Sequence, residues 1–168
     1  MLSKKMESAI NKQVNLEIHS ALMYLQMSAH FSQQNLNGFA RWMRVQYQEE
    51  LNHAGKLFDY VLRRDGNITL EAVAAPPKTW RTTLAACEAA YQAEVNNTKQ
   101  INALMDQAIK ENDHATRVIL EWFVEEQVEE ESSALNLIEQ VKMASDEPGA
   151  VLLLDRELGA RQPSAAEE

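Results

Sequence analysis

The sequence predicts an all-α protein, folded as a four-helix bundle with one long crossover and a short fifth helix at the C-terminal end. Glycine and proline, the two residues that most disfavour helices, occur only five and four times in 168 residues. Apolar side chains recur at alternating spacings of three and four along four long stretches, which is typical of bundle helices. Residues 66–81 contain Pro76 and Pro77 and show no such period, so we interpret them as the crossover.

The long helices are bounded by residues that favour turns and helix ends. Residues 35–38 separate the first two helices, and residues 65–67 end the second. A short turn separates the third and fourth helices, and Asp113 is expected to cap the fourth. The four helices are expected at about residues 4–33, 37–65, 82–111 and 114–143.

The crossover is long enough to run the length of the bundle. A helix of about 28 residues is about 42 Å long, whereas about sixteen extended residues reach about 50 Å. The third helix is therefore expected to begin at the far end of the bundle. The apolar segment 150–154 and its polar continuation predict a short helix at about 149–159. We expect a single domain over residues 1–168, with the bundle at about 4–143.

Composition and charge narrow the function classes. The chain carries 25 acidic and 16 basic residues, a net charge of −9, which disfavours binding to nucleic acid. The single cysteine, Cys87, cannot form an internal disulfide and fits a reducing compartment. The first residues lack the apolar stretch of a signal peptide, and no apolar run approaches the roughly twenty residues that span a bilayer. We therefore expect a cytoplasmic protein that does not bind membranes.

In each of the four long stretches, the regular series of apolar side chains is interrupted by polar residues near its midpoint. Helices of equal length that pack side by side bring their midpoints to one level, so these side chains should meet. Burying several carboxylates together costs many kcal/mol unless protons or a cation compensate them. A Glu and a His three residues apart, projecting inward from a bundle helix, are typical of di-iron carboxylate proteins. The interruptions are Glu17, Glu50 with His53, Glu94, and Gln127 with Glu130.

The donor types narrow the choice of ion. Carboxylates with one imidazole suit a divalent ion such as iron, manganese or zinc. The absence of thiolates from this set disfavours a structural zinc site. Five or six such ligands are enough for two metal ions that share a bridging carboxylate.

With these residues in place, the chain resembles the non-haem bacterial ferritins over nearly its whole length. The helix lengths, the long crossover and the short fifth helix also match that family. The resemblance implies a ferroxidase that oxidises Fe(II) with oxygen or peroxide and stores ferric mineral in a homo-oligomeric shell of 24 subunits. The residues that carry it are Glu17, Tyr24, Glu49-Glu50-x-x-His53, Glu94 and Glu126-Gln127-x-Glu129-Glu130.

The resemblance also implies a role for each residue. One iron would be held by Glu17, Glu50 and His53. Glu50 would bridge to a second iron, held also by Glu94 and Glu130. Gln127 would lie beside the pair, and Tyr24 would be either a buried hydrogen-bonded tyrosine or an electron donor. A third iron site would be formed by Glu49, Glu126, Glu129 and Glu130.

Two departures separate this chain from haem-binding relatives. Haem-binding bacterioferritins have methionine after the bridging glutamate, where this chain has Leu51. They also carry a second Glu-x-x-His, where this chain has Gln127 and Glu130. No haem is therefore expected. Mini-ferritins that coat DNA fit poorly, because they usually lack the fifth helix.

The same residues are compatible with other interpretations. One is a rubrerythrin-type di-iron oxidase or peroxidase, which usually adds a cysteine cluster that one cysteine cannot supply. Another is a structural helical bundle whose polar layer only fixes the register. The third iron site competes with an ordinary solvated charge run at residues 125–131. Outside the series, Trp122 is expected to be a packing residue, and His19 and His30 are expected at the surface.

Overall fold

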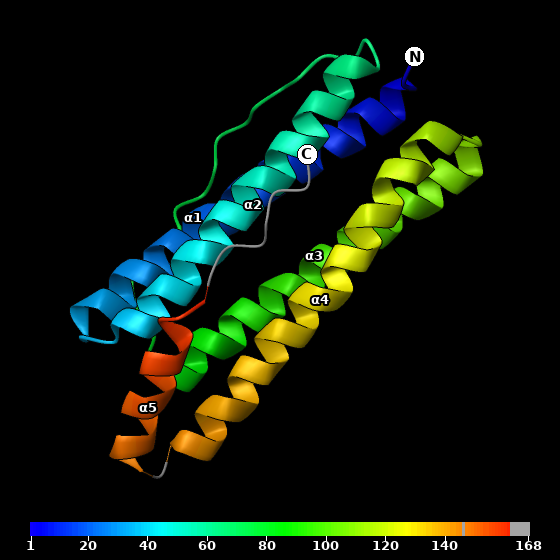
Figure 1. The fold of residues 1–168 in the computed structure, drawn as a ribbon. Coiled ribbons are helices and arrows are strands. Elements are labelled where there is room, and N and C mark those ends of the chain that lie inside the picture. The colour runs from blue at the N-terminus through cyan, green and yellow to red at the C-terminus, as the bar shows by residue number, and fades with distance from the viewer. Residues whose placement is uncertain (146, 162–168) are drawn as a thin grey trace.

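The computed structural model describes residues 1–145 and 147–161 of the chain, and it contains five helices within them (Figure 1). Their bounds are within two residues of the expected ones at every end, and the predicted all-α bundle with one crossover is confirmed. Residue 146 and residues 162–168, which the expected domain also includes, lie outside the described residues. The helices are α1 (Lys4–Gln33), α2 (Asn37–Arg63), α3 (Thr83–Glu111), α4 (His114–Ala144) and α5 (Pro148–Leu158).

Three of the long helices begin at side chains that cap them. The Ser3 hydroxyl accepts a hydrogen bond from the Met6 amide at the start of α1, and Thr82 does the same at α3. Asp113 caps α4 as predicted, accepting from the Thr116 amide at 3.1 Å. Such caps satisfy amide groups that the first helical turn leaves without a partner.

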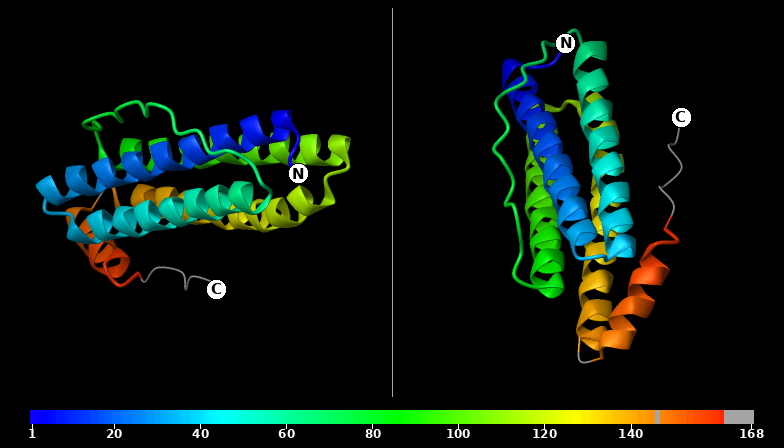
Figure 2. Two further views of the ribbon diagram at one scale, coloured as in Figure 1. Left: turned by 90° about the horizontal axis from the view of Figure 1, so that it is seen from above. Right: turned by 90° about the vertical axis from the view of Figure 1, so that its left-hand side faces the viewer.

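The start of α2 is capped by another helix instead. Leu36 precedes α2 and has no capping side chain, but Asp155 of α5 accepts hydrogen bonds from the amides of Gly38 (2.8 Å) and Phe39 (3.0 Å). Gly38 is required here, because a Cβ at this position would lie 1.5 Å from the Asp155 carbonyl oxygen. This contact fixes α5 against the end of the bundle, where it packs on α2 and α4 (Figure 2).

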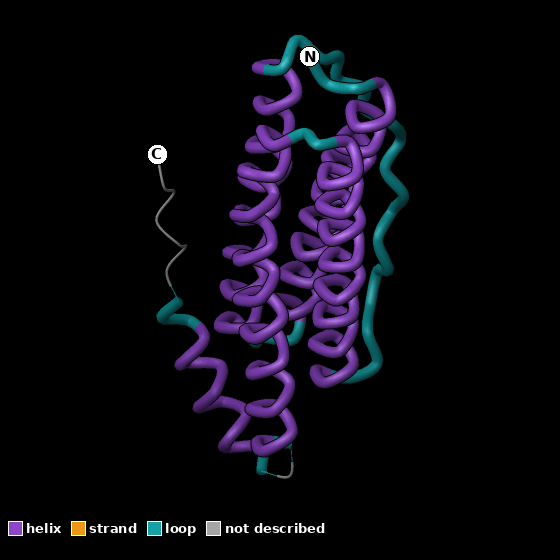
Figure 3. The backbone as a smooth tube through the Cα atoms, turned by 90° about the vertical axis from the view of Figure 1, so that its right-hand side faces the viewer, coloured by secondary structure: helices purple, strands orange, loops and turns teal. Residues whose placement is uncertain are grey.

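The long helices form two antiparallel pairs, α1 with α2 and α3 with α4, and α1 packs against α3. The crossover runs along the outside of the helices from one end of the bundle to the other, as expected (Figure 3). The side chains of Asn11 and Asn15 hold its backbone at Asn67, Thr69 and Glu71 through hydrogen bonds of 2.7–3.0 Å.

The crossover also buries a residue that the sequence analysis placed at the surface. Trp80 packs edge-on against the His30 ring, with centroids 5.3 Å apart, and Phe31 flanks the same ring at 5.5 Å. His30 is consequently buried, and its expected exposure was wrong. His19 is half-buried rather than fully exposed.

The core consists of two apolar clusters at opposite ends of the bundle. One is centred on Phe31 and Phe39, and the other on Ile10 and Leu57. Between them lies a layer of buried polar side chains. Within the described part of the chain, no helix combines the length and apolar character needed to cross a lipid bilayer.

Candidate metal centre

Three predicted ligands meet at the middle of the bundle. Glu17 of α1 lies beside Glu50 and His53 of α2, and each residue offers one ligand atom within 4.8 Å of the other two. The Glu50 and His53 side chains lie on one face of α2 because they are three residues apart. All three residues are buried, and no more than 3% of any of them is exposed. This is the arrangement that the polar interruptions of the first two helices predicted.

His53 also belongs to a second group of ligand atoms. Its Nε2 lies 3.9 Å from Glu126 Oε1, while its Nδ1 lies 3.7 Å from Glu50 Oε2. The ligand atoms of His53, Glu126 and Glu130 lie within 4.8 Å of one another. The imidazole therefore stands between carboxylates of α2 and α4. The resemblance had assigned Glu126 only to a third site, whereas the structure places it beside the histidine.

Several buried acceptors in this layer have no donor. Neither oxygen of Glu50 receives a hydrogen bond from the described residues when the carboxyl groups are ionised, and Glu94 Oε2 and His53 Nδ1 also lack partners. Buried polar atoms normally have hydrogen-bond partners, so several atoms without partners in one layer need another explanation. Cations or protons at these atoms would supply it. Hard carboxylate oxygens with one imidazole fit iron, as they also fit manganese or zinc.

The protonation of the layer follows from its burial. Burial raises the pKa of Glu50 well above its usual range, and the charges of Glu94 and Glu17 raise it further. Burial raises the pKa of Glu94 to about 7, although hydrogen bonds from Tyr24 and Gln127 oppose the rise. Burial and the charge of Glu94 raise the pKa of Glu130 to about 8. Without a cation, the layer therefore holds protons at neutral pH.

The pKa of the His53 imidazole shifts in the opposite direction. Burial lowers the pKa of His53, although the charges of Glu17 and Glu49 oppose this effect. A neutral imidazole is the form that binds a metal ion. The rings of Trp122 and Phe123 pack edge-on against His53 at centroid distances of 5.5 and 5.9 Å. Trp122 thus has the packing role expected from sequence, and it also shapes the wall of the site.

An amide network that the sequence analysis missed holds Glu17. Gln13 Nε2 donates to Glu17 Oε1 at 2.6 Å, and Asn97 Nδ2 donates to Glu17 Oε2 at 3.1 Å. Gln13 also donates to Asn97 Oδ1 at 2.5 Å, which joins α1 to α3. Both carboxylate oxygens are therefore held in place. Spacing along the helices could have indicated both amides, since Gln13 precedes Glu17 by one helical turn and Asn97 follows Glu94 by one.

Two further amides donate hydrogen bonds to groups of α3 and α4 in the polar layer. Gln46 lies one turn before Glu50, and its Nε2 donates to Glu130 Oε2 at 2.7 Å. Gln127 Nε2 donates to the Glu94 carbonyl oxygen at 3.3 Å and to Thr98 Oγ1 at 3.2 Å. Gln127 is buried in the polar layer as predicted, with 2% exposed, and its Oε1 lies 3.4 Å from Asn97 Nδ2.

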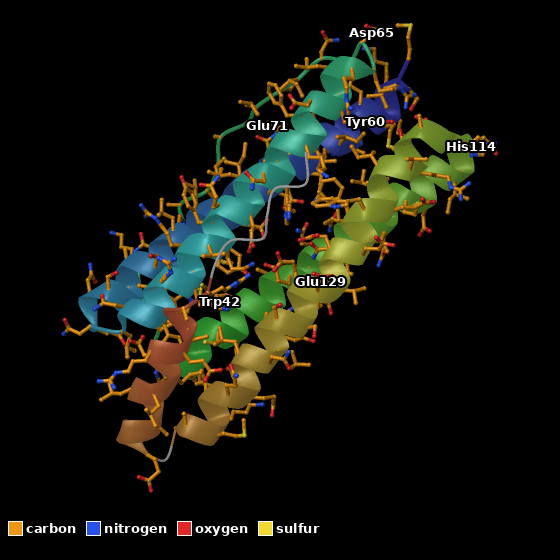
Figure 4. All side chains as sticks on the ribbon, in the orientation of Figure 1. Trp42, Tyr60, Asp65, Glu71, His114 and Glu129 are labelled. Carbon is orange, nitrogen blue, oxygen red and sulfur yellow. The ribbon has the colours of Figure 1, made fainter. Side chains whose placement is uncertain are left out.

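The residues proposed for a third site are arranged less uniformly. Glu126 and Glu130 share the group with His53, whereas Glu129 is exposed at the middle of α4 (Figure 4). Glu49 is buried and accepts a hydrogen bond from Arg161 Nη2 at 2.9 Å. The Arg161 guanidinium also lies over the Trp42 ring, 4.6 Å from its centroid. A cationic side chain from beyond α5 therefore reaches the edge of the site, and no sequence pattern indicated it.

Comparisons with known proteins agree with this geometry. The model of the ferritin-like domain family matches residues 7–144. A bacterial non-heme ferritin of Bacteroides fragilis is 38% identical over 161 residues, which are 96% of this chain and 100% of that protein. One of Campylobacter jejuni is 31% identical over 156 residues, 93% of each chain. The crystal structure of an open pore ferritin from the archaeon Archaeoglobus fulgidus is 49% identical with a TM-score of 0.95, and the match covers 96% of this chain and 100% of that chain.

Proposed function

This chain belongs to the ferritin-like domain family, and on that premise we propose that it stores iron by oxidising Fe(II) at a di-iron centre within the subunit. The ferric product would be deposited as mineral inside an oligomeric shell. The observation that carries the proposal is Glu50, whose two buried oxygens have no donor among the described residues when the carboxyl groups are ionised. Glu50 also lies beside the Glu17 carboxylate and the His53 imidazole.

Iron is the substrate of this reaction. Glu17, Glu50 and His53 would bind one Fe(II), and Glu50 would bridge to a second Fe(II) held by Glu94 and Glu130. Each ion gives up one electron, and the two electrons with two protons reduce one O2 to H2O2, or one H2O2 to two water molecules. A bridging carboxylate keeps the two ions close enough to react with the same oxidant. Carboxylate ligands also favour Fe(III), because their negative charge compensates its higher charge.

Proton release accompanies iron binding in this proposal. Glu94 and Glu130, whose pKa values are raised to about 7 and about 8, hold protons when no cation is present. Fe(II) must displace these protons, because metal ligands bind in their deprotonated form. Gln13 and Asn97 hold the two oxygens of Glu17 in the metal-free protein, so that ligand is oriented before iron arrives. Tyr24 holds one oxygen of Glu94 in the same way.

The product would leave on the side of α4. Glu130 is shared with a third iron site that would include Glu49, Glu126 and Glu129, and this site offers a route from the di-iron centre to the mineral. A Glu130→Ala variant that keeps its fold should transfer iron more slowly. Unchanged transfer in that variant would contradict this route.

The remaining features of the proposal rest on the resemblance to non-haem bacterial ferritins and on the composition and charge of the chain. We propose a homo-oligomer of 24 subunits in the cytoplasm, one domain per chain and no binding of nucleic acid. Leu51 and Gln127 stand where haem-binding relatives have other residues, so no haem site is proposed. The oxidant is oxygen or peroxide.

One experiment tests the central proposal. Metal-free protein would receive Fe(II) under anaerobic conditions, and air would then be admitted while absorbance and particle size are followed together. We expect Fe(II) to bind first, Fe(III) to form rapidly on contact with air, and the product to remain inside particles of constant size. Oxidation that is no faster than in buffer would contradict a ferroxidase. Peroxide turnover without retained iron would instead favour an enzyme of rubrerythrin type.

A further inference from the structure

A groove between α1 and α3 leads from the surface to the amide that holds Glu17. It has a volume of about 140 Å³. Its walls combine small or apolar side chains with three glutamine amides and one lysine. The lining residues are Ala9, Lys12, Gln13 and Leu16 of α1 and Gln100, Ala103, Leu104 and Gln107 of α3.

Gln13 separates this groove from the candidate metal centre. It lines the groove, yet only 3% of the residue is exposed, and its Nε2 donates to Glu17 Oε1 at 2.6 Å. Gln13 therefore contacts both the groove and a predicted iron ligand. Glu17 keeps its hydrogen bond from Asn97 at 3.1 Å if Gln13 turns away. Rotation of Gln13 would break its hydrogen bonds to Glu17 and Asn97 and would leave the carboxylate held by Asn97.

The charge of the lining disfavours a cation. Among the eight described residues that line the groove, none is a carboxylate, and Lys12 is positively charged. The nearby carboxylate of Glu111 already accepts hydrogen bonds from Gln107 at 3.0 Å and from Ser3 at 2.6 Å. Pathways for cations are usually lined by acidic side chains. The groove is therefore a poor entrance for Fe(II), whereas α2 and α4 carry the acidic residues Glu49 and Glu126.

We propose that this groove admits the neutral oxidant, dioxygen or hydrogen peroxide, and that Gln13 is its gate. Apolar walls accept a small uncharged molecule, and the glutamine amides offer hydrogen bonds to peroxide. Iron and oxidant then approach the centre from different sides, so an iron ion in transit does not block the oxidant. The inference rests on the proposed ferroxidase function and adds the route of its second substrate.

Filling the groove tests the route without altering the ligands. Ala103 is exposed on α3, so Ala103→Phe places a ring in the groove and leaves the core unchanged. Ala9→Phe fills it from the α1 wall. Ala29→Phe is the matched control, because Ala29 is exposed on α1 and does not line the groove. Each variant would be loaded anaerobically with Fe(II), with binding measured by calorimetry and particle size checked.

The loaded proteins would then be mixed with increasing dioxygen in one series and increasing hydrogen peroxide in another. We expect both groove variants to bind Fe(II) like the parent and the control, but to need a several-fold higher oxidant concentration for the same oxidation rate. An effect in only one series would identify which oxidant uses the groove.

The outcomes separate the two proposals. Normal Fe(II) binding with an unchanged dependence on both oxidants in Ala103→Phe and Ala9→Phe would overturn the groove route and leave the proposed function standing. Weakened Fe(II) binding with unchanged oxidant dependence would also overturn it, because iron would then be the species that the groove admits. Failure of the parent protein to bind Fe(II) would contradict the proposed function itself, and the groove proposal with it.

Discussion

Tyr24 of α1 donates a hydrogen bond from its phenol hydroxyl to Glu94 Oε1 of α3, across the polar layer of the bundle. Both side chains are buried, and the other oxygen of Glu94 has no hydrogen-bond partner among the described residues. Burial and the charges of Glu94 and Glu50 raise the pKa of Tyr24 well above its usual value. Tyr24 therefore remains a neutral donor that orients one predicted iron ligand and leaves the other oxygen of that ligand available.

A Tyr24→Phe variant should weaken iron binding at low pH more than at high pH. The hydrogen bond from Tyr24 lowers the pKa of Glu94, so its loss makes the carboxyl harder to deprotonate. The ring contact with Trp42, at a centroid distance of 6.4 Å, is retained by phenylalanine. The loss of a hydrogen bond that orients a metal ligand typically lowers metal affinity about 10- to 100-fold. Anaerobic Fe(II) titrations between pH 6 and 8 would measure the change, and an equal loss at every pH would contradict this explanation.

Replacing Glu50 or His53 with alanine should abolish rapid Fe(II) oxidation while leaving the fold and assembly nearly intact. Glu50 is a carboxyl group buried among other carboxyl groups, and burial raises its pKa well above its usual value. Its removal therefore takes away a polar group that is costly to bury in the metal-free protein. Oxidation would be followed by stopped-flow absorbance, and folding by circular dichroism and particle size. Glu88→Ala, at an exposed position of α3, is the control. Oxidation at the parental rate in both site variants would refute the assignment of the centre.

The sequence was sufficient to predict the helices and the level at which the polar side chains meet. Spacing alone placed Glu17, Glu50 and Glu94 on the inner faces of three helices, because a buried helix must turn one consistent stripe towards the core. The crossover could be predicted because its length matches that of the helices. These features depend on local periodicity and chain length, which a single sequence contains.

What the sequence did not reveal depends on contacts between distant segments. Asn97 looks like an ordinary surface asparagine until α1 brings Glu17 within hydrogen-bond distance. Arg161 lies 112 residues from Glu49, and no periodic pattern connects them. His30 is buried only because the crossover carries Trp80 over it. Each of these contacts arises from packing between elements, so helix periodicity cannot predict it.

The metal-free protein should lose stability as the pH rises from 6.5 to 8.5. The pKa values of Glu94 and Glu130 are raised from 4.5 to about 7 and about 8 in the folded state. The folded protein therefore binds more protons than the unfolded chain in this range, and their stabilising effect, complete below about pH 4.5, is lost through pH 7 to 8. Each carboxyl group contributes at most about 1.4 kcal/mol per pH unit.

The lower limit of this pH range avoids an opposing effect. The pKa of His53 is lowered from 6.5, so this group makes the protein more stable as the pH rises towards 6.5. Above pH 6.5 it causes little further change in stability. Melting temperatures in the presence of a chelator would measure the loss. A Glu94→Gln, Glu130→Gln double variant should show a flatter pH dependence. A parent protein that becomes more stable towards pH 8.5 would show that the polar layer is not protonated as described.

An Arg161→Gln variant should bind an additional divalent ion near Glu49 more tightly than the parent does. The Arg161 guanidinium donates to Glu49 Oε2 at 2.9 Å, and its charge also lowers the pKa of Glu130. A third iron ion would need the same carboxylates, so Arg161 competes with it both for the Glu49 oxygen and through charge repulsion. Arg41 Nε holds the backbone of Arg161 at 3.1 Å, and this hydrogen bond keeps the residue in position in both proteins.

The measurement for Arg161 is the number and affinity of Fe(II) ions bound per subunit under anaerobic conditions. Arg156→Gln is the matched control, because it removes the same charge from an exposed position on α5. We expect Arg161→Gln to strengthen the weakest binding step several-fold and to leave the step at Glu17, Glu50 and His53 unchanged, because Arg161 acts on Glu49 and Glu130, which are not ligands of that ion. A weaker third step would mean that Arg161 orders Glu49 for iron instead of competing with it. If Arg156→Gln strengthens the third step equally, the effect comes from the net charge of the protein and not from the contact between Arg161 and Glu49.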